Sequence, residues 1–538
     1  MAYYKDFREH LQALEAHGKL TRIKRTINKD TQLHPLVRLQ FRGLPEQQRK
    51  AFLFENVVDA KGRTYPGPVA VGAIAGSTEI YAIGMMCRPD EIVEKWLQAQ
   101  VHPIEPRVIA TGPVQDEVHM GESLLEHGGL GEFPIPISTP GFDNAPYFSS
   151  PYWISRDPET GIRNVGTYRV MVKAPARTGI YFGGKGDQHI EIHWRRCREK
   201  RVRLQAAIVV GAPPNIGYLS VSKIPFGVDE LAVAGGIAGE AVELVKCKTV
   251  DLEVPAYAEI AIEGEFSLDE VEPEAPFGEA GGYMGERMMM PIFNVTCITH
   301  RKNPIWQSFI SQLAPSESSK IKQIAWQNNL YKYLKHDLNL PEVLQVAFHE
   351  EASLVGNMAV IQVGKMERPE IWQMLDAVSR HRAVGKMVIV VDKDINPWDN
   401  DALNWALSTR MMPNRDIKIV EGRAVAQDHS AERPGHWVGR DPSTEVFTKG
   451  ARLLIDATMK WPYPPVSLPK KEFMEEALRI WEQEGLPPLN LKEPWYGYNL
   501  GYWSDEDEQE ARLAVRGEHY RTGEALIGRR NTLAKPKT

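Results

Sequence analysis

The chain has 538 residues, of which 43% are hydrophobic and 25% charged, and its formal net charge is −6. This length suits two or three domains, and the composition is that of an ordinary globular protein. Because no basic field or long block of one charge sign is present, nucleic acid is excluded as the expected partner.

The N-terminal part of the chain begins with a predicted helix over residues 6–17. Phe7 and Leu11 recur at helical spacing, Asp6 is placed to cap the start, and Gly18 is placed to end the helix. The first ten residues carry charge from Lys5 onward and lack the apolar stretch of a signal peptide.

The middle of the chain alternates between strand and helix patterns. Residues 103–150, rich in proline and glycine, predict a long ordered loop. Two apolar runs on either side of residues 157–161 predict a hairpin. Further strands are expected at 204–210, 256–264 and 290–301, and helices at 188–199, with Asp187 as its cap, and at 229–246.

The C-terminal part opens with one predicted helix over residues 316–337, which is expected to link two domains. Beyond it, short apolar strands alternate with helical stretches such as 370–381, which indicates an α/β domain with a largely buried sheet. The strands are expected at 357–363, 386–394 and 418–422. The predicted divisions of the chain are 1–315, 316–337, 338–465 and a C-terminal extension, 466–538.

The cysteines and the hydropathy pattern bear on the compartment. Cys87, Cys197, Cys247 and Cys297 form no C-x-x-C pair, so neither a disulfide framework nor a zinc knuckle is expected. Such sparse cysteines suit a reducing compartment. No stretch of about 18 apolar residues predicts a membrane span. We therefore expect a cytoplasmic protein with no membrane partner.

Three short motifs resemble functional signatures without completing them. Residues 179–186, GIYFGGKG, approach a phosphate-binding loop, but Gly186 stands where Ser or Thr would hold magnesium. His349-Glu350-Glu351 lacks the second histidine of a zincin helix and is interpreted as solvated surface. The glycines of 234–240 fit close helix packing as well as phosphate binding.

Two glutamates, Glu274 and Glu279, lie five residues apart on a turn that contains proline and glycine, and an apolar run follows at 288–290. Burial near apolar walls and a second carboxylate both raise a carboxyl pKa, whereas an arginine keeps one of a pair ionised. Such a pair could supply one acid and one base at neutral pH. Taken alone, the fragment fits a surface acidic loop better.

Asn164, His189 and Glu230 offer oxygen and nitrogen ligands, but they are too dispersed for spacing to reveal a site. Each also has an ordinary structural interpretation, as a residue near a turn, a packed histidine and a first-turn glutamate favoured by the helix dipole. Taken alone, the structural interpretation of each residue is the better one.

Six motifs in order, however, resemble the UbiD decarboxylases. They are the asparagine and arginine of NVGTYR (164–169), the pair Gln188-His189, the loop IPFGVDE ending at Glu230, the block 243–265, the loop E-x-P-F-G-E (274–279) and, counted together as the sixth, the C-terminal blocks WALSTR (405–410) and LLIDATMK (453–460). The match runs over most of residues 1–460, and the longer C-terminal form is similar to the phthaloyl-CoA decarboxylase branch.

The resemblance implies prenylated FMN, a divalent metal (Mn²⁺ or Fe²⁺) and K⁺ as cofactors. The implied divalent-metal ligands are Asn164, His189 and Glu230, a hard oxygen and nitrogen set that suits these metals. Potassium would be held by Glu230 and by backbone oxygens around Ser220 and Ser222. The implied cofactor-binding residues are Asn164, Arg169, Gln188, His189, Ser220, Ser222, Glu230 and, for the phosphate, Arg452, with Lys449 as the other basic candidate.

The resemblance also implies the catalytic residues Arg169, Glu274 and Glu279. Glu279 would be the general acid that reprotonates the carbon, Arg169 would orient the substrate or the flavin, and Glu274 would hold Arg169 in place. Because Asn164 and Arg169 are an odd number of residues apart, a regular strand would point them to opposite faces. We therefore expect a bulge at Gly166.

By the same resemblance, the fold is expected to be α+β and α/β. A flavin-binding domain with a split β-barrel-like sheet would be followed by a linking helix and an α/β oligomerisation domain. The implied activity is reversible, non-oxidative decarboxylation of an aromatic or α,β-unsaturated acid, or of an aryl-CoA such as phthaloyl-CoA. The expected partners are that substrate, a flavin prenyltransferase and further copies of the chain, from dimer to hexamer. A conventional FMN oxidoreductase and a non-catalytic subunit stay open as alternatives.

Two histidines have structural interpretations that we prefer. His193 lies one helical turn after His189 and is interpreted as a surface residue or as a neighbour of the metal ligands rather than a ligand itself. His436 lies in a loop of proline and glycine, where a loop contact is favoured over a role in the substrate pocket.

Overall fold

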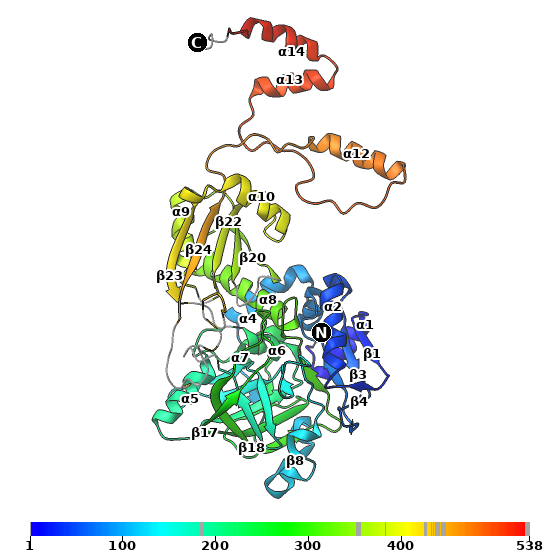
Figure 1. Ribbon diagram of the computed structural model, residues 1–538, viewed down its shortest axis with the longest axis vertical. Coiled ribbons are helices and arrows are strands. Elements are labelled where there is room, and N and C mark those ends of the chain that lie inside the picture. The colour runs from blue at the N-terminus through cyan, green and yellow to red at the C-terminus, as the bar shows by residue number, and fades with distance from the viewer. Residues whose placement is uncertain are drawn as a thin grey trace. The chain divides into compact units, whose positions relative to one another are not determined.

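The computed structural model describes residues 2–182, 188–222, 224–350, 357–381, 383–423, 428–431, 433, 435, 442 and 448–532. Helices alternate with several sheets (Figure 1), which confirms the mixed α+β and α/β class. The chain divides into two compact units, one of residues 1–361, 373–389 and 418–454 and one of residues 362–372, 390–417 and 455–538. The domain boundaries expected at residues 315, 337 and 465 stay predictions.

The largest sheet has nine strands and is antiparallel in every pair that borders the site. Its order is β11-β10-β14-β17-β18-β13-β12-β9, with β8 beside β18, and the described strands do not close into a barrel. The strands are β8 (Glu117–Met120), β9 (Tyr147–Phe148), β10 (Tyr152–Arg156), β11 (Arg163–Gly166), β12 (Val170–Ala174), β13 (Arg177–Ile180), β14 (Gln205–Val210), β17 (Ile260–Glu274) and β18 (Met288–His300).

The core of this sheet is aromatic. Trp153 stacks on Phe266 with ring centroids 5.4 Å apart and meets Phe293 edge-on at 5.0 Å. All three side chains are fully buried. Offset and edge-to-face pairs of this kind add about 0.5–1.5 kcal/mol each beyond their buried area. They hold together β10, β17 and β18, the strands that lead to the candidate site.

The N-terminal helix α1 (Phe7–Ala16) confirms the helix expected there. Asp6 caps it by accepting from the amide of Glu9 at 2.9 Å. Its buried face includes His10, whose Nε2 donates to the carbonyl of Ala73 at 2.7 Å. The other elements of this region are β1 (Leu20–Ile23), β2 (Ile27–Asn28), α2 (Leu33–Gly43), β3 (Ala51–Phe54), β4 (Val57–Val58), β5 (Thr64–Tyr65), β6 (Val69–Val71), α3 (Thr78–Met85), α4 (Ile92–Val101) and β7 (Arg107–Val108).

Two predicted elements have different bounds in the structure. The helix expected over 229–246 is α7 (Glu230–Ala238), because Gly239 takes a left-handed φ of 74° and ends it. The following residues form β15 (Glu243–Lys246), which pairs with β16 (Glu253–Pro255). The strand expected over 256–264 starts later, at Ile260, and continues to Glu274 because β18 pairs with it at both ends, over residues 260–266 and 271–274.

The predicted linking helix is present as α8 (Glu317–Lys332), followed by the wider turn Tyr333–Asp337. Ser316 caps it through an Oγ that accepts from the amide of Ser319 at 3.1 Å. Five later strands follow the order β20-β21-β22-β24-β23. They are β20 (Val343–Phe348), β21 (Met358–Val363), β22 (Met387–Asp392), β23 (Ile417–Arg423) and β24 (Lys449–Ala457), with α9 (Arg368–Val378), α10 (Asn400–Arg410), α12 (Lys471–Gln483), α13 (Asp505–Val515) and α14 (His519–Leu526).

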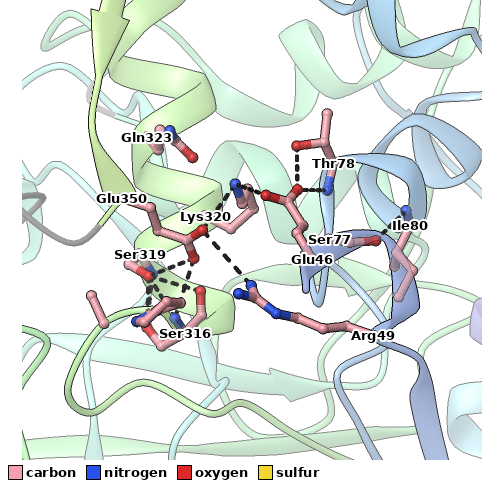
Figure 2. Close-up of polar contacts among 12 residues, drawn as sticks. Glu46, Arg49, Ser77, Thr78, Ile80, Ser316, Ser319, Lys320, Gln323 and Glu350 are labelled. Atoms are coloured by element: carbon pink, nitrogen blue, oxygen red, sulfur yellow. Dashed lines mark hydrogen bonds and ion pairs between the residues drawn. The ribbon is translucent and has the colours of Figure 1, made fainter. Parts of the chain in front are cut away.

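A buried ionic network joins α8 to the N-terminal region (Figure 2). The ammonium of Lys320 lies 3.0 Å from a carboxylate oxygen of Glu46 and 3.0 Å from one of Glu350. Burial opposes the charge of Lys320, but the two carboxylates raise its pKa above the usual value. Glu46 also accepts from the amide and the hydroxyl of Thr78, both at 2.6 Å. His349 and Glu350 are buried, so their interpretation as solvated surface is wrong.

Among the described residues, no helix combines the length and the apolar character needed to cross a bilayer.

Candidate active site

The three predicted metal ligands come together although they lie on three different elements. Asn164 sits in β11, His189 is the first residue of α5 (His189–Glu199), and Glu230 is the first residue of α7. His189 Nδ1 lies 3.1 Å from Asn164 Oδ1 and 3.6 Å from Glu230 Oε1. Asn164 and Glu230 are only 3% and 2% exposed, so the cluster is nearly sealed from bulk solvent.

The cluster has the electrostatics of a cation site. Burial raises the pKa of Glu230, while His189 and the amide of Val165, which donates to Glu230 Oε2 at 2.9 Å, act against that rise. Within the described chain, Asn164 Nδ2 is buried without a hydrogen-bond partner. Phe226 meets the His189 ring edge-on at 5.1 Å and lines a small cavity with Asn164 and His189. A divalent cation would compensate the buried carboxylate.

His193 lies beside this cluster but is directed to a protein partner. Its Nδ1 is 3.0 Å from the hydroxyl of Ser155, and burial lowers its pKa to about 4. His193 is only 2% exposed, so its interpretation as a surface residue is wrong, while a neutral histidine bonded to Ser155 fits its interpretation as a neighbour of the metal ligands. The described helix begins after Gln188, and the predicted cap Asp187 lies outside the described residues.

Ser220 and Ser222 stand at the end of α6 (Pro214–Val221), next to the strand that carries Asn164. The carbonyl of Ser220 accepts from the amide of Thr167 at 2.7 Å, and the two side-chain hydroxyls are also 2.7 Å apart. The hydroxyl of Ser222 donates to the carbonyl of Tyr218 at 2.7 Å. The end of this helix is therefore tied to Thr167, while the potassium ligand role of the two serines stays a prediction.

The second cluster is built on Arg169. Its Nε and Nη2 donate to the two oxygens of Glu274 at 2.9 and 2.6 Å, a bidentate pair, and its Nη1 binds Glu279. Burial opposes the guanidinium charge, but the pairing with Glu274 raises the pKa of Arg169 further above its usual value. The predicted trio therefore meets in one place, which replaces the interpretation of 274–279 as a surface loop.

The two glutamates of this trio differ in exposure. The Glu274 side chain is fully buried, whereas that of Glu279 is 23% exposed. Arg169 also lies 4.3 Å from the ring centroid of Tyr181 and 5.4 Å from that of Phe277, so aromatic faces cover the guanidinium. Glu274 is thus a fixed partner of the arginine, and Glu279 is the carboxyl group that can reach solvent.

Asn164 and Arg169 reach their clusters without the bulge expected at Gly166. Strand β11 ends at Gly166, and β12 starts at Val170, so three residues with no strand pairing separate them. The amide of Thr167 bonds to Ser220 instead of a neighbouring strand. This break removes the constraint of strand alternation. Because Arg169 is the fifth residue after Asn164, the two Cα atoms lie no more than about 18 Å apart.

Two residues of this site carried no sequence signal. Asp143 accepts from the amides of Thr139 and Gly278 at 2.6 and 3.3 Å, and burial raises its pKa to about 6. It fixes the loop that bears Glu279. Tyr147 is fully buried, and its hydroxyl has no hydrogen-bond partner in the described chain. Burial, assisted by the charge of Glu274, raises the pKa of this tyrosine, so it stays a neutral donor.

Among the described residues, Arg452 lies outside the contacts of these two clusters. Arg452 in β24 donates to the carbonyl of Val384 at 3.4 Å, and burial lowers its pKa. No hydrogen bond or ion pair between described residues connects it to Arg169 or Glu230. Residues 183–187 and His436 lie outside the described part of the chain.

Comparison with known proteins gives three consecutive family matches. Residues 11–100, 107–313 and 326–457 match the N-terminal, Rift-related and C-terminal domains of the 3-octaprenyl-4-hydroxybenzoate carboxy-lyase family, UbiD. An uncharacterised protein of Synechocystis is 30% identical over 537 residues, which cover 92% of this chain and 100% of that protein.

Solved structures agree. The UbiD-class enzyme HmfF from Pelotomaculum thermopropionicum, in an evolved dimeric form in complex with prenylated FMN, is 28% identical, with a TM-score of 0.73 over 88% of this chain and 100% of that one. The vanillic acid decarboxylase of Sedimentibacter hydroxybenzoicus is 23% identical, with a TM-score of 0.75 over 90% of this chain and 100% of that one, which is a likeness of fold alone.

Proposed function

The chain belongs to the UbiD family of carboxy-lyases, and on that premise we propose that it removes CO2 reversibly from an aromatic or α,β-unsaturated carboxylic acid with prenylated FMN as its cofactor. The observation that carries this proposal is the buried cluster of Arg169, Glu274 and Glu279. An arginine fixed by one sealed carboxylate, beside a second carboxyl group open to solvent, is suited to orient an anion and deliver a proton.

The residues of the first cluster fit the cofactor phosphate and its metal. Asn164, His189 and Glu230 present converging oxygen and nitrogen atoms around a buried carboxylate. That donor set suits Mn²⁺ or Fe²⁺, with K⁺ nearby at Glu230 and the backbone of Ser220 and Ser222. A bound cation would screen the phosphate from a protein whose net charge is −6. The modified flavin, when bound, supplies the electron sink that no ordinary side chain offers.

The residues of the second cluster divide the remaining work. Arg169 orients the substrate carboxylate, and Glu274 keeps the guanidinium in one position through two hydrogen bonds. Glu279 holds a proton on its carboxyl group and delivers it to the carbon that has lost CO2. Because Glu279 is partly exposed, it can take a new proton from solvent after each turnover. Tyr147 offers a neutral hydroxyl beside this pair.

We propose an aromatic acid as the substrate class, and an aryl-CoA such as phthaloyl-CoA as a narrower candidate. The C-terminal extension supports the narrower candidate, because it continues past the residues that match the family and ends in basic residues. Paired assays of an aromatic acid and its CoA ester distinguish the two. Faster CO2 release from the ester would support an aryl-CoA substrate, and release from the free acid alone would contradict it.

The same extension supports assembly with further copies of the chain. Helix α12 has no buried residue, and Phe473 and Ile480 lie 46% and 50% exposed on one helical face. A second copy of this chain would cover such a face. A flavin prenyltransferase, which would supply the cofactor, is the other proposed partner.

Substitution of the proton donor tests the proposed function. Glu279→Gln should lower the rate of CO2 release about 10²–10⁴-fold, because it removes a general acid. The measurement is CO2 release under anaerobic conditions from a panel of aromatic acids, with the circular dichroism spectrum as a check on folding. The control is Glu270→Gln, an exposed glutamate of the same hairpin. Equal rates for Glu279→Gln and the parent would remove Glu279 from the mechanism.

A further inference from the structure

A second group of metal-ligating side chains lies apart from the candidate active site. His119, Glu132 and His300 place ligand atoms within 4.8 Å of one another. The two histidines are 8% and 6% exposed. His300 ends β18, whereas Glu274 pairs with the other end of that strand at Met288, so the two sites are separated by roughly 40 Å along the strand.

Sheet pairing explains why the two histidines meet. Strand β8 runs antiparallel to β18, with His119 opposite Ile298. His300 lies two residues further along β18 and therefore on the same face as Ile298. Diagonal neighbours of this kind are within reach of long side chains. The two rings meet edge-on with centroids 5.1 Å apart.

The third ligand is held by the core. Glu132 ends the short helical turn Gly129–Glu132, and the next residue, Phe133, is buried against the His300 ring at 5.5 Å. Glu132 Oε2 lies 3.2 Å from His119 Nδ1, and Oε1 lies 3.6 Å from His300 Nε2. A tetrahedral zinc site with bonds of about 2.0–2.1 Å separates its ligand atoms by about 3.3 Å.

The facing atoms of His119, His300 and Glu132 have no hydrogen-bond partners among the described residues. Among the described residues, His119 Nδ1, His300 Nε2 and Glu132 Oε2 are buried with no hydrogen-bond partner. His300 Nδ1 lies 2.8 Å from the carbonyl of Arg301, which can only accept, so Nδ1 carries the proton. Nε2 then directs a lone pair toward a carboxylate, an arrangement of two acceptors that a cation resolves. A histidine held through its other nitrogen by a carbonyl is the usual form of a metal ligand.

We propose that His119 Nδ1, His300 Nε2 and the carboxylate of Glu132 bind a Zn²⁺ ion, with water as the fourth ligand. Two imidazoles and one carboxylate form a donor set that zinc accepts. The exposed ring of His127 stacks on His119 with ring centroids 4.7 Å apart. The ion would clip the segment from β8 to Phe133 onto the end of β18, far from the cluster of Arg169, Glu274 and Glu279, so it would take no direct part in decarboxylation.

The test uses the full-length His189→Ala protein, in which the divalent site of the flavin is disabled. We expect it to retain one zinc per chain after gel filtration, measured by mass spectrometry of the metal, and to give the visible spectrum of tetrahedral Co²⁺ when cobalt replaces zinc. A further Glu132→Gln change should weaken zinc binding at least about 100-fold, because it removes a direct ligand. The matched control, Glu126→Gln, changes an exposed glutamate of the same segment and should leave zinc binding unaltered.

Absence of zinc from the His189→Ala protein, or binding that Glu132→Gln leaves unchanged, would overturn the proposal. If Glu132→Gln does not fold, crystals of the parent protein soaked in zinc decide the matter. An anomalous peak at the zinc edge between His119 and His300 would support the site, and its absence would contradict it.

Discussion

Arg169 makes three hydrogen bonds to Glu274 and Glu279 through one planar group, and the geometry of that group matters. Its bidentate pair with Glu274 uses two nitrogens in a fixed fork, which leaves Nη1 for Glu279. A lysine carries one point charge on a flexible stem and cannot reproduce the fork. The position of the positive charge therefore depends on arginine itself.

Arg169→Lys should consequently lower the rate of CO2 release by on the order of 100-fold, because misplacement by about 1 Å costs that much. The measurement is the initial rate at saturating substrate, with the flavin content determined on the same samples. Arg177→Lys, a more exposed arginine of β13, is the control. A parental rate for Arg169→Lys would contradict the orienting role.

For single residues, the sequence predicts the metal ligands and the catalytic residues only through the order of the motifs that contain them. Asn164, His189 and Glu230 have no diagnostic spacing, and they meet because a strand and two helix starts converge. Tyr147 and Asp143 gave no signal at all, since an isolated tyrosine or aspartate in a loop carries no pattern. Their roles follow from burial, which only the folded chain defines.

At the scale of elements, helix α1 shows how a buried polar side chain supports a loop. His10 lies on the buried face of the helix and donates to Ala73 at 2.7 Å. Burial lowers its pKa to about 4. Glu317 of α8 accepts from the amides of Gly72 and Ile74 at 2.9 and 2.8 Å, so two helices hold the same short loop.

This histidine gives a pH dependence of known sign. The unfolded chain takes up a proton on His10 below a pKa of about 6.5, and the folded chain does not do so until about pH 4, so folding stability is lost as the pH falls through this window. Between about pH 6.5 and pH 4, the free energy of unfolding should fall by about 3 kcal/mol because of His10.

His10→Gln keeps an N–H donor for Ala73 and should remove that part of the pH dependence. Urea unfolding at pH 7 and pH 4 measures it, and His17→Gln, an exposed histidine just beyond α1, is the control. An unchanged difference between the two pH values in His10→Gln would show that His10 does not titrate in this way.

The periodicity of apolar residues predicts where a helix or strand occurs better than the residues at which it begins and ends. The helix at 6–17 carries its own cap at Asp6 and was predicted nearly to the residue. The helix predicted at 229–246 is too long, because the glycines of 234–240 fit close packing and phosphate binding equally well, and nothing in that pattern marks Gly239 as the helix end. The bulge expected at Gly166 was wrong, since the break at 167–169 depends on Ser220, which lies 53 residues from Thr167 along the chain.

At the scale of the whole molecule, the family matches cover residues 11–457 with two short gaps, and the extension follows them. The order of six motifs was sufficient to predict the family. No pattern could predict the group of His119, Glu132 and His300, because its members come from distant segments that only the sheet brings together.

The proposed homo-oligomer predicts that α12 is covered by a second copy. The double change Phe473→Asp and Ile480→Asp should lower the assembly mass measured by light scattering, because charges on an apolar face oppose its burial. Glu475→Ala, an exposed position of the same helix, is the control. A parental mass for the double variant would show that this face does not mediate assembly.

The central claim is that this chain uses prenylated FMN. The most direct test is to co-express the chain with a flavin prenyltransferase, purify it without oxygen and measure the mass of the released cofactor. We expect the mass of prenylated FMN, together with CO2 release from an aromatic acid. Unmodified FMN with turnover of a nicotinamide would contradict it in favour of an oxidoreductase, and a folded protein with no flavin would contradict it in favour of a non-catalytic subunit.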